Sequence, residues 1–215
     1  MPPNAAIKAV AFDVGGVLTC PLRETMTKIS ADGTLDMAVV GPQFRDSFLG
    51  GHDGDQPSHR LERGEITIDE FVDSLGPARE SVWRLMHPDS PHSLFAHVTP
   101  HAGMHGLVDD SRSAGYRTAI ISNIFTEYLT KWDEITNHPG RFDAVVYSCI
   151  EGVRKPNRAI FDLALERLQL TAGEILFIDD SPDIVAAAGD LGFRTVHVAD
   201  HDDAIAEARM LLGLS

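Results

Sequence analysis

Separate segments of the sequence carry the side chains that phosphoryl transfer uses. Asp13 follows an apolar run near the start of the chain, Ser122 ends a second run, and Asp179 and Asp180 end a later one. Lys155 stands between the second run and the last. A carboxylate can attack phosphorus, and carboxylates are good ligands for the hard cation Mg²⁺. A lysine and a hydroxyl can stabilise charge on the phosphoryl oxygens. Together these residues predict phosphoryl transfer, provided that the fold brings them to one place.

Five apolar runs predict the strands that must position these groups. They are short and rich in β-branched residues, as strands buried on both faces are. The runs are residues 7–14, 117–122, 143–148, 174–179 and 194–198. In a parallel sheet the carboxyl ends of the strands share one edge, where the connecting loops form a crevice. Because Asp13, Ser122 and Asp179 fall at such ends, we expect them to lie close together.

Helical patterns lie between these runs. Residues 156–168 carry apolar side chains at helical spacing, and residues 182–191 are alanine-rich and followed by Gly192, a good helix stop. Strand and helix patterns alternate from about residue 98 onward. This alternation predicts an α/β fold with a doubly wound parallel sheet and right-handed crossovers.

The segment 20–96 interrupts the alternation. It has no convincing strand, and Thr67 and Glu70 have the spacing of a helix capping box. We therefore predict an α/β core made of residues 1–19 and 97–215, with residues 20–96 forming a small helical cap. Four large side chains at helical spacing are interpreted as the core of this cap: Phe71, Leu75, Trp83 and Met86.

Composition narrows the choice of partners. The formal net charge is −14, which disfavours binding to nucleic acid or to anionic membranes. The two cysteines are too few for a disulfide framework or a zinc site. The sequence starts without a signal-peptide pattern and has no apolar run long enough to cross a bilayer. We expect a cytoplasmic protein, monomeric or homodimeric, that acts on a small molecule.

Four motifs in order resemble those of the haloacid dehalogenase-like (HAD) hydrolase superfamily. They are FDVGGVL at 12–18, IISN at 120–123, GVRKP at 152–156 and FIDDSPD at 177–183. Taken singly, each would also suit a helix cap, a turn or a solvated surface, but four in this order favour the resemblance. It implies a Rossmann-like core, a cap inserted after the first motif, and hydrolysis of a small phosphorylated metabolite.

The resemblance also implies a role for individual side chains. Asp13 would be the nucleophile and would form an aspartyl-phosphate. Ser122 would hold the transferring phosphoryl group, helped by backbone N–H groups near Val14, Gly15 and Asn123. Lys155 would stabilise the nucleophile and the developing charge.

A magnesium ion is implied as well. Its ligands would be Asp13, the backbone carbonyl of Gly15, and Asp180, with Asp179 in or near the coordination shell. Members of the superfamily usually carry a second aspartate where Gly15 stands, and that aspartate protonates the leaving oxygen. General acid–base help is worth roughly 10²–10⁴ in rate. We therefore expect slow turnover of alkyl phosphates, or a substitute group from the cap or from water.

Two arginines are further candidates for binding phosphate or a substrate carboxylate. Arg23 follows the first motif, and Arg154 precedes Lys155. For each, a solvated or salt-bridged surface position is the simpler interpretation.

Three functions are compatible with these observations. The first is a Mg²⁺-dependent phosphatase. The second is a dehalogenase in which Asp13 attacks carbon without a metal, although relatives with that chemistry usually have a Ser-Asn pair in place of Asp179 and Asp180. The third is a binding or regulatory protein with weakened catalysis, which Gly15 and the apolar Ile184 in the fourth motif favour.

Overall fold

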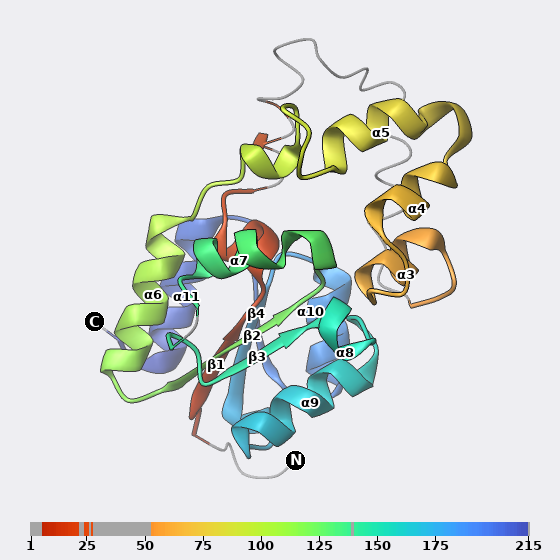
Figure 1. Ribbon diagram of the computed structural model, residues 1–215. Helices are drawn as coiled ribbons and strands as arrows, with labels where there is room; N and C mark the ends of the chain where they lie inside the picture. Colours follow the sequence, from red (N-terminus) through yellow and green to blue (C-terminus); the bar gives the residue numbers. More distant parts are fainter. Residues whose placement is uncertain (1–5, 22–23, 26, 28–52, 139, 215) are drawn as a thin grey trace.

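The computed structural model describes residues 6–21, 24, 25, 27, 53–138 and 140–214. Its centre is a parallel sheet of five strands in the order β3-β2-β1-β4-β5 (Figure 1). The strands are β1 (Ala9–Phe12), β2 (Arg117–Ser122), β3 (Ala144–Tyr147), β4 (Ile175–Asp179) and β5 (Arg194–His197). Each falls within one of the five apolar runs. The predicted α/β class and parallel sheet are confirmed.

Alternate residues of the strands face two separate hydrophobic clusters, so the sheet is buried on both sides. Val10 and Phe12 of β1 belong to one cluster, and Ala9 and Ala11 to the other. The first cluster includes side chains of α6 (Ala102–Ser113), α7 (Leu129–Thr136) and α11 (His201–Leu212). The second includes side chains of α9 (Arg158–Leu168) and α10 (Pro182–Asp190). The result is a sheet between two helical layers, as doubly wound folds require (Figure 1).

Local chemistry explains where these helices begin. The predicted helix at 156–168 starts two residues later than its pattern, because the Asn157 side chain accepts a hydrogen bond from the Ala159 N–H and caps α9. Asp200 caps α11 in the same way, accepting from the N–H groups of Asp202 and Asp203. A short helix, α8 (Ser148–Glu151), follows β3 directly.

Between residues 53 and 96 the structure contains helices and no strand. These are α3 (Pro57–Glu62), α4 (Ile68–Asp73), η2 (Gly76–Ala78), α5 (Arg79–Met86) and η3 (Leu94–Ala96). The capping box of Thr67 and Glu70 is present at the start of α4, as predicted. The division into a core and a cap at residues 20 and 96 remains a prediction, and Arg23 lies outside the described residues.

The helical segment is joined to the sheet layers by buried hydrogen bonds. Ser148 Oγ donates to the carbonyl oxygen of Glu62 over 2.5 Å. Tyr128 Oη donates to the carbonyl oxygen of Met86 over 2.6 Å. Within the described ranges, the structure has no helix with the length and apolar character needed to span a bilayer.

Candidate active site

The carboxyl ends of the two central strands place two aspartates side by side. Phe12 and Ile178 are register partners of β1 and β4, so Asp13 and Asp179 are the next residues of adjacent strands. The Asp13 N–H continues the ladder by donating to the Ile178 carbonyl oxygen over 2.9 Å. Sheet register, rather than side-chain packing, thus fixes the separation of these two carboxylates.

Lys155 is buried between them, with only 2% of its surface exposed. Its Nζ lies 2.7 Å from Asp13 Oδ1 and 2.6 Å from Asp179 Oδ2. Burial alone would lower the pKa of the lysine, but the two carboxylates outweigh it and raise the pKa above its usual value. Lys155 therefore stays charged, and it holds the Asp13 carboxylate in place.

The Asn123 side chain fixes the backbone that carries Lys155. Its Oδ1 accepts from the Lys155 N–H over 2.8 Å, and its Nδ2 donates to the Lys155 carbonyl oxygen over 3.1 Å. The peptide bond from Lys155 to Pro156 is cis. The second and third motifs, predicted separately from the sequence, are thereby joined. The two hydrogen bonds of its side-chain amide also give Asn123 a positioning role that the sequence did not indicate.

Asp179 and Asp180 occupy different environments. Both oxygens of Asp179 are engaged, since Lys155 Nζ donates to Oδ2 and the Ser181 N–H donates to Oδ1 over 2.9 Å. No side chain of the described residues donates to the Asp180 carboxylate. Burial and the neighbouring carboxylates raise the pKa of Asp179 to about 6 and that of Asp180 to about 7.

These three carboxylates fit a divalent cation. Asp13, Asp179 and Asp180 each offer one oxygen, and the three oxygens lie within 4.8 Å of one another. Lys155 supplies one positive charge against three carboxylates, which leaves negative charge that burial makes costly. Oxygen ligands of this kind suit Mg²⁺. Asp180, whose oxygens have no other side-chain donor, is the ligand most available to it.

The turn Val14–Leu18 (η1) lies against the same carboxylates. Gly16 has a φ of 75°, and a Cβ there would fall 2.2 Å from Asp180 Oδ2. Only glycine fits this position. Gly15 differs, because its backbone has φ −68° and ψ 123° and a Cβ would meet nothing within 4 Å. The place where the superfamily usually carries an acid is therefore open space.

Ser122 ends β2 next to this cluster. Its side chain is buried, and its Oγ has no hydrogen-bond partner among the described residues. A buried hydroxyl without a partner is costly, which is compatible with the predicted contact to a phosphoryl oxygen. Asn123 lines the pocket described next, whereas Ser122 does not. The predicted role of Ser122 remains a prediction.

A pocket of about 450 Å³ opens beside the carboxylates, a size typical of small-molecule sites. We call one group of its lining residues the charged wall: Asp13, Asn123, Lys155, Asp179 and Asp180. A second group, the apolar wall, comes from η3, the residues around it and the region of α7: Met86, Leu94, Phe95, Val98, Phe125 and Trp132. Gly15 and Gly16 also face the pocket.

Arg154 lines the pocket in a buried ion pair that the sequence did not predict. Its Nε lies 2.5 Å from Glu62 Oε2, and both residues are buried. Burial raises the pKa of Glu62, which the arginine opposes. Arg154 is thus a buried residue at the site rather than a surface arginine, and its predicted contact with substrate remains a prediction. Glu62 had no signal in the sequence, because a glutamate at the end of a short helical pattern is typical of an exposed position.

The model of the haloacid dehalogenase-like hydrolase family matches residues 7–192. The chain is 31% identical to mouse (Mus musculus) acyl-CoA dehydrogenase family member 10 over 96% of this chain, which spans only 19% of that protein's length. It is 27% identical to the sesquiterpene phosphatase astK of Aspergillus oryzae over 96% of this chain and 97% of that protein.

Two further comparisons concern a shorter match and a solved structure. The (S)-2-haloacid dehalogenase 4A of Burkholderia cepacia is 31% identical over 49% of this chain and 46% of its own length. The structure of a predicted HAD-like family hydrolase from Porphyromonas gingivalis has a TM-score of 0.66 at 25% identity, covering 98% of this chain and 100% of that one.

Proposed function

Because the chain belongs to the haloacid dehalogenase-like hydrolase family, we propose that it is a Mg²⁺-dependent phosphohydrolase with Asp13 as its nucleophile. The observation that carries the proposal is the cluster of three carboxylates beside the pocket, two of them buried and bonded to the single buried lysine Lys155. Attack on carbon requires only the Asp13 carboxylate, so it does not explain why three carboxylates lie beside one lysine. A bound divalent cation would neutralise this charge and would also bind an oxygen of a phosphoryl group.

Residues of the charged wall, together with Ser122, have separate roles in the proposed reaction. Lys155 orients the Asp13 carboxylate, and one oxygen of that carboxylate attacks phosphorus. The new bond to phosphorus forms as the bond to the ester oxygen breaks, which gives an aspartyl-phosphate and an alkoxide or phenolate that takes a proton from water to become the alcohol or phenol. Water then attacks the phosphorus, inorganic phosphate leaves, and the Asp13 carboxylate is restored. Ser122 and Lys155 stabilise charge on the phosphoryl oxygens.

A Mg²⁺ ion held by Asp13, Asp179 and Asp180 would neutralise phosphoryl charge, and Gly15 would offer its carbonyl oxygen. Gly15 brings no side chain to protonate the leaving oxygen. We therefore expect faster turnover of an aryl phosphate, whose leaving group needs no proton, than of an alkyl phosphate, whose leaving oxygen must take its proton from water.

The similarity to a sesquiterpene phosphatase along nearly its whole length supports a phosphatase. The match to a dehalogenase keeps the second candidate, halide displacement by Asp13, open to test. The pair Asp179 and Asp180 opposes that candidate, since both carboxylates stand beside the nucleophile and would repel the carboxylate of a haloacid.

The test is hydrolysis of an aryl phosphate by the wild type and by Asp13→Asn, each with and without Mg²⁺. We expect Mg²⁺-dependent turnover that the variant loses by on the order of 10⁴-fold or more. Asp162→Asn is the matched control, because Asp162 is an exposed aspartate on α9 whose ion pair is with exposed Arg158.

Circular dichroism establishes that each variant is folded. Halide release from a 2-haloacid without metal, in the absence of phosphatase activity, would overturn the proposal in favour of the dehalogenase. Inactivity of the folded wild type on both substrates would favour a binding or regulatory protein.

A further inference from the structure

The pocket is chemically two-sided. Its charged wall can hold a phosphoryl group, but its apolar wall has no charged side chain. Met86, Leu94, Val98, Phe125 and Trp132 all belong to one buried hydrophobic cluster, and Phe95 packs against it. A phosphate alone would leave the part of the pocket beside this wall to water, which apolar side chains bind poorly, so the wall favours the organic part of a substrate.

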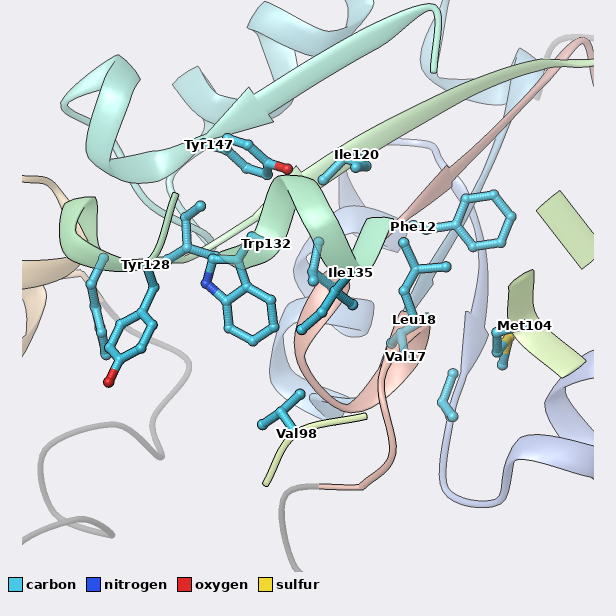
Figure 2. Packing of buried hydrophobic residues seen from close by; sticks show 14 of the residues in the cluster. Phe12, Val17, Leu18, Val98, Met104, Ile120, Tyr128, Trp132, Ile135 and Tyr147 are labelled. Atoms are coloured by element: carbon cyan, nitrogen blue, oxygen red, sulfur yellow. The ribbon is translucent and has the colours of Figure 1, made fainter. Parts of the chain in front are cut away.

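Aromatic contacts make the apolar wall a continuous surface. The ring of Phe95 lies 5.3 Å from that of Trp132 and 6.1 Å from that of Phe125, both in edge-on geometry. It also lies 3.8 Å from the ring of Tyr128. Figure 2 shows Trp132, Tyr128 and Val98 at one end of the hydrophobic cluster, with Phe12 and Met104 at the other.

The apolar wall offers almost no hydrogen bonds. Its one polar side-chain atom is Trp132 Nε1, which is buried and has no partner among the described residues. Glu62 and Arg154 also line the pocket, but they are bonded to each other. The hydroxyls of a sugar or a nucleoside would lose their water on this wall without gaining partners, and each such loss weakens binding.

We infer that the substrate is the phosphate monoester of a mainly apolar alcohol, with its hydrocarbon part on the apolar wall and its phosphoryl group on the charged wall. This inference rests on the proposed phosphatase function for the identity of the anionic group. The hydrocarbon part is recognised by burial alone, so affinity increases with its length until the pocket is filled.

The test uses n-alkylphosphonates from methyl to dodecyl, which resemble the ester but cannot be hydrolysed. Their affinities for the full chain are measured by calorimetry with Mg²⁺ present, and as inhibition of aryl phosphate hydrolysis. Each methylene buried on the wall should strengthen binding about fourfold, up to a plateau. Glucose 6-phosphate, a polar ester of similar size, should bind no more tightly than methylphosphonate.

Two variants locate the effect. Phe95→Ala should weaken the longest bound chains by on the order of tenfold and leave methylphosphonate unchanged, because it removes wall surface but no charged group. Leu165→Ala is the matched control. Leu165 is a half-buried residue of α9 that packs on the opposite face of the sheet, in the second cluster. Leu165→Ala should change neither the affinity for long-chain alkylphosphonates nor the affinity for methylphosphonate.

The outcomes separate this inference from the proposed function. Turnover of aryl phosphates together with affinities independent of chain length would overturn the inference and leave the phosphatase standing. A dependence on chain length that Phe95→Ala does not reduce would also overturn it, because binding would then lie elsewhere. Binding that depends on chain length and on Phe95, without any turnover, would refute the phosphatase and overturn the monoester as a substrate, leaving it only as a ligand of the two walls.

Discussion

The two walls of the pocket are built by different means. The charged wall stands on strand ends and on backbone hydrogen bonds, so the sheet register determines where Asp13 and Asp179 lie. The apolar wall stands on short helices and loops, held by packing between side chains such as Phe95 and Trp132. Register admits no small adjustment, since a shift of one residue turns a side chain to the other face. Packing tolerates substitution of similar volume. The residues proposed for the chemistry thus stand on the sheet, and those proposed for selectivity stand where substitution of similar volume is tolerated.

The buried pair of Glu62 and Arg154 links the helical segment to the loop that carries Lys155. Glu62→Leu should destabilise the protein by about 3–5 kcal/mol, because it leaves the buried arginine without its carboxylate. Urea denaturation followed by circular dichroism measures this. The control is Glu80→Leu, which removes an exposed pair with Arg84 and should cost within about 0.5 kcal/mol. Equal losses in the two variants would contradict this view of the link.

Gly15→Asp tests whether the absence of a general acid at this position is what limits the hydrolysis of alkyl phosphates. Since a Cβ at this position meets nothing within 4 Å, the variant should fold normally. It should raise kcat on an alkyl phosphate by about 10²–10⁴, the usual worth of general acid–base catalysis. Gly15→Ala fills the same space without an acid and should give no gain. If both variants behave alike, the missing aspartate is not what limits turnover.

Magnesium should stabilise the protein more at pH 8 than at pH 5.5. In the folded state the pKa of Asp180 is raised to about 7 and that of Asp179 to about 6, above the roughly 3.9 of an unfolded aspartate. The folded state therefore binds more protons, and the metal-free protein loses stability as the pH rises from about 4 to 7. A cation replaces those protons. At a hundred times its Kd, Mg²⁺ should add about 2.7 kcal/mol at pH 8.

Differential scanning calorimetry with Mg²⁺ or EDTA measures this difference at both pH values. Asp180→Asn should remove most of it, since that side chain has no other side-chain donor among the described residues. An equal effect of Mg²⁺ at the two pH values would place the cation elsewhere.

Thr67→Ala should have the smallest effect. It removes the capping box of α4, which costs about 1 kcal/mol of stability. Hydrolysis of a small aryl phosphate should be unchanged, because α4 contributes nothing to the charged wall. Thr171→Ala, in the second capping box, is the matched control. A drop in kcat with Thr67→Ala alone would show that the helical segment affects the chemistry as well as selectivity.

The sequence predicted the charged wall better than the apolar wall, for a physical reason. Strands buried on both faces show as apolar runs, and the polar residue that ends each run marks the sheet edge, as at Asp13 and Asp179. The pair of Glu62 and Arg154 joins residues 92 positions apart, and neither partner has a local pattern. Met86 was interpreted as cap core, but it is buried in the cluster that also covers one face of the sheet, and it lines the pocket. A core residue and a substrate-facing residue look alike in sequence.

The open space at Gly15 affects how easily this position can change during evolution. Glycine and aspartate codons can differ by one nucleotide, and the backbone here has angles that any residue adopts. A lineage can therefore gain or lose an acid at this position in a single step, with no rearrangement around it. Gly16 allows no such step, because its neighbour Asp180 occupies the space of a side chain. Two adjacent glycines are thus under opposite constraints, one free to vary with the chemistry and the other fixed by the site itself.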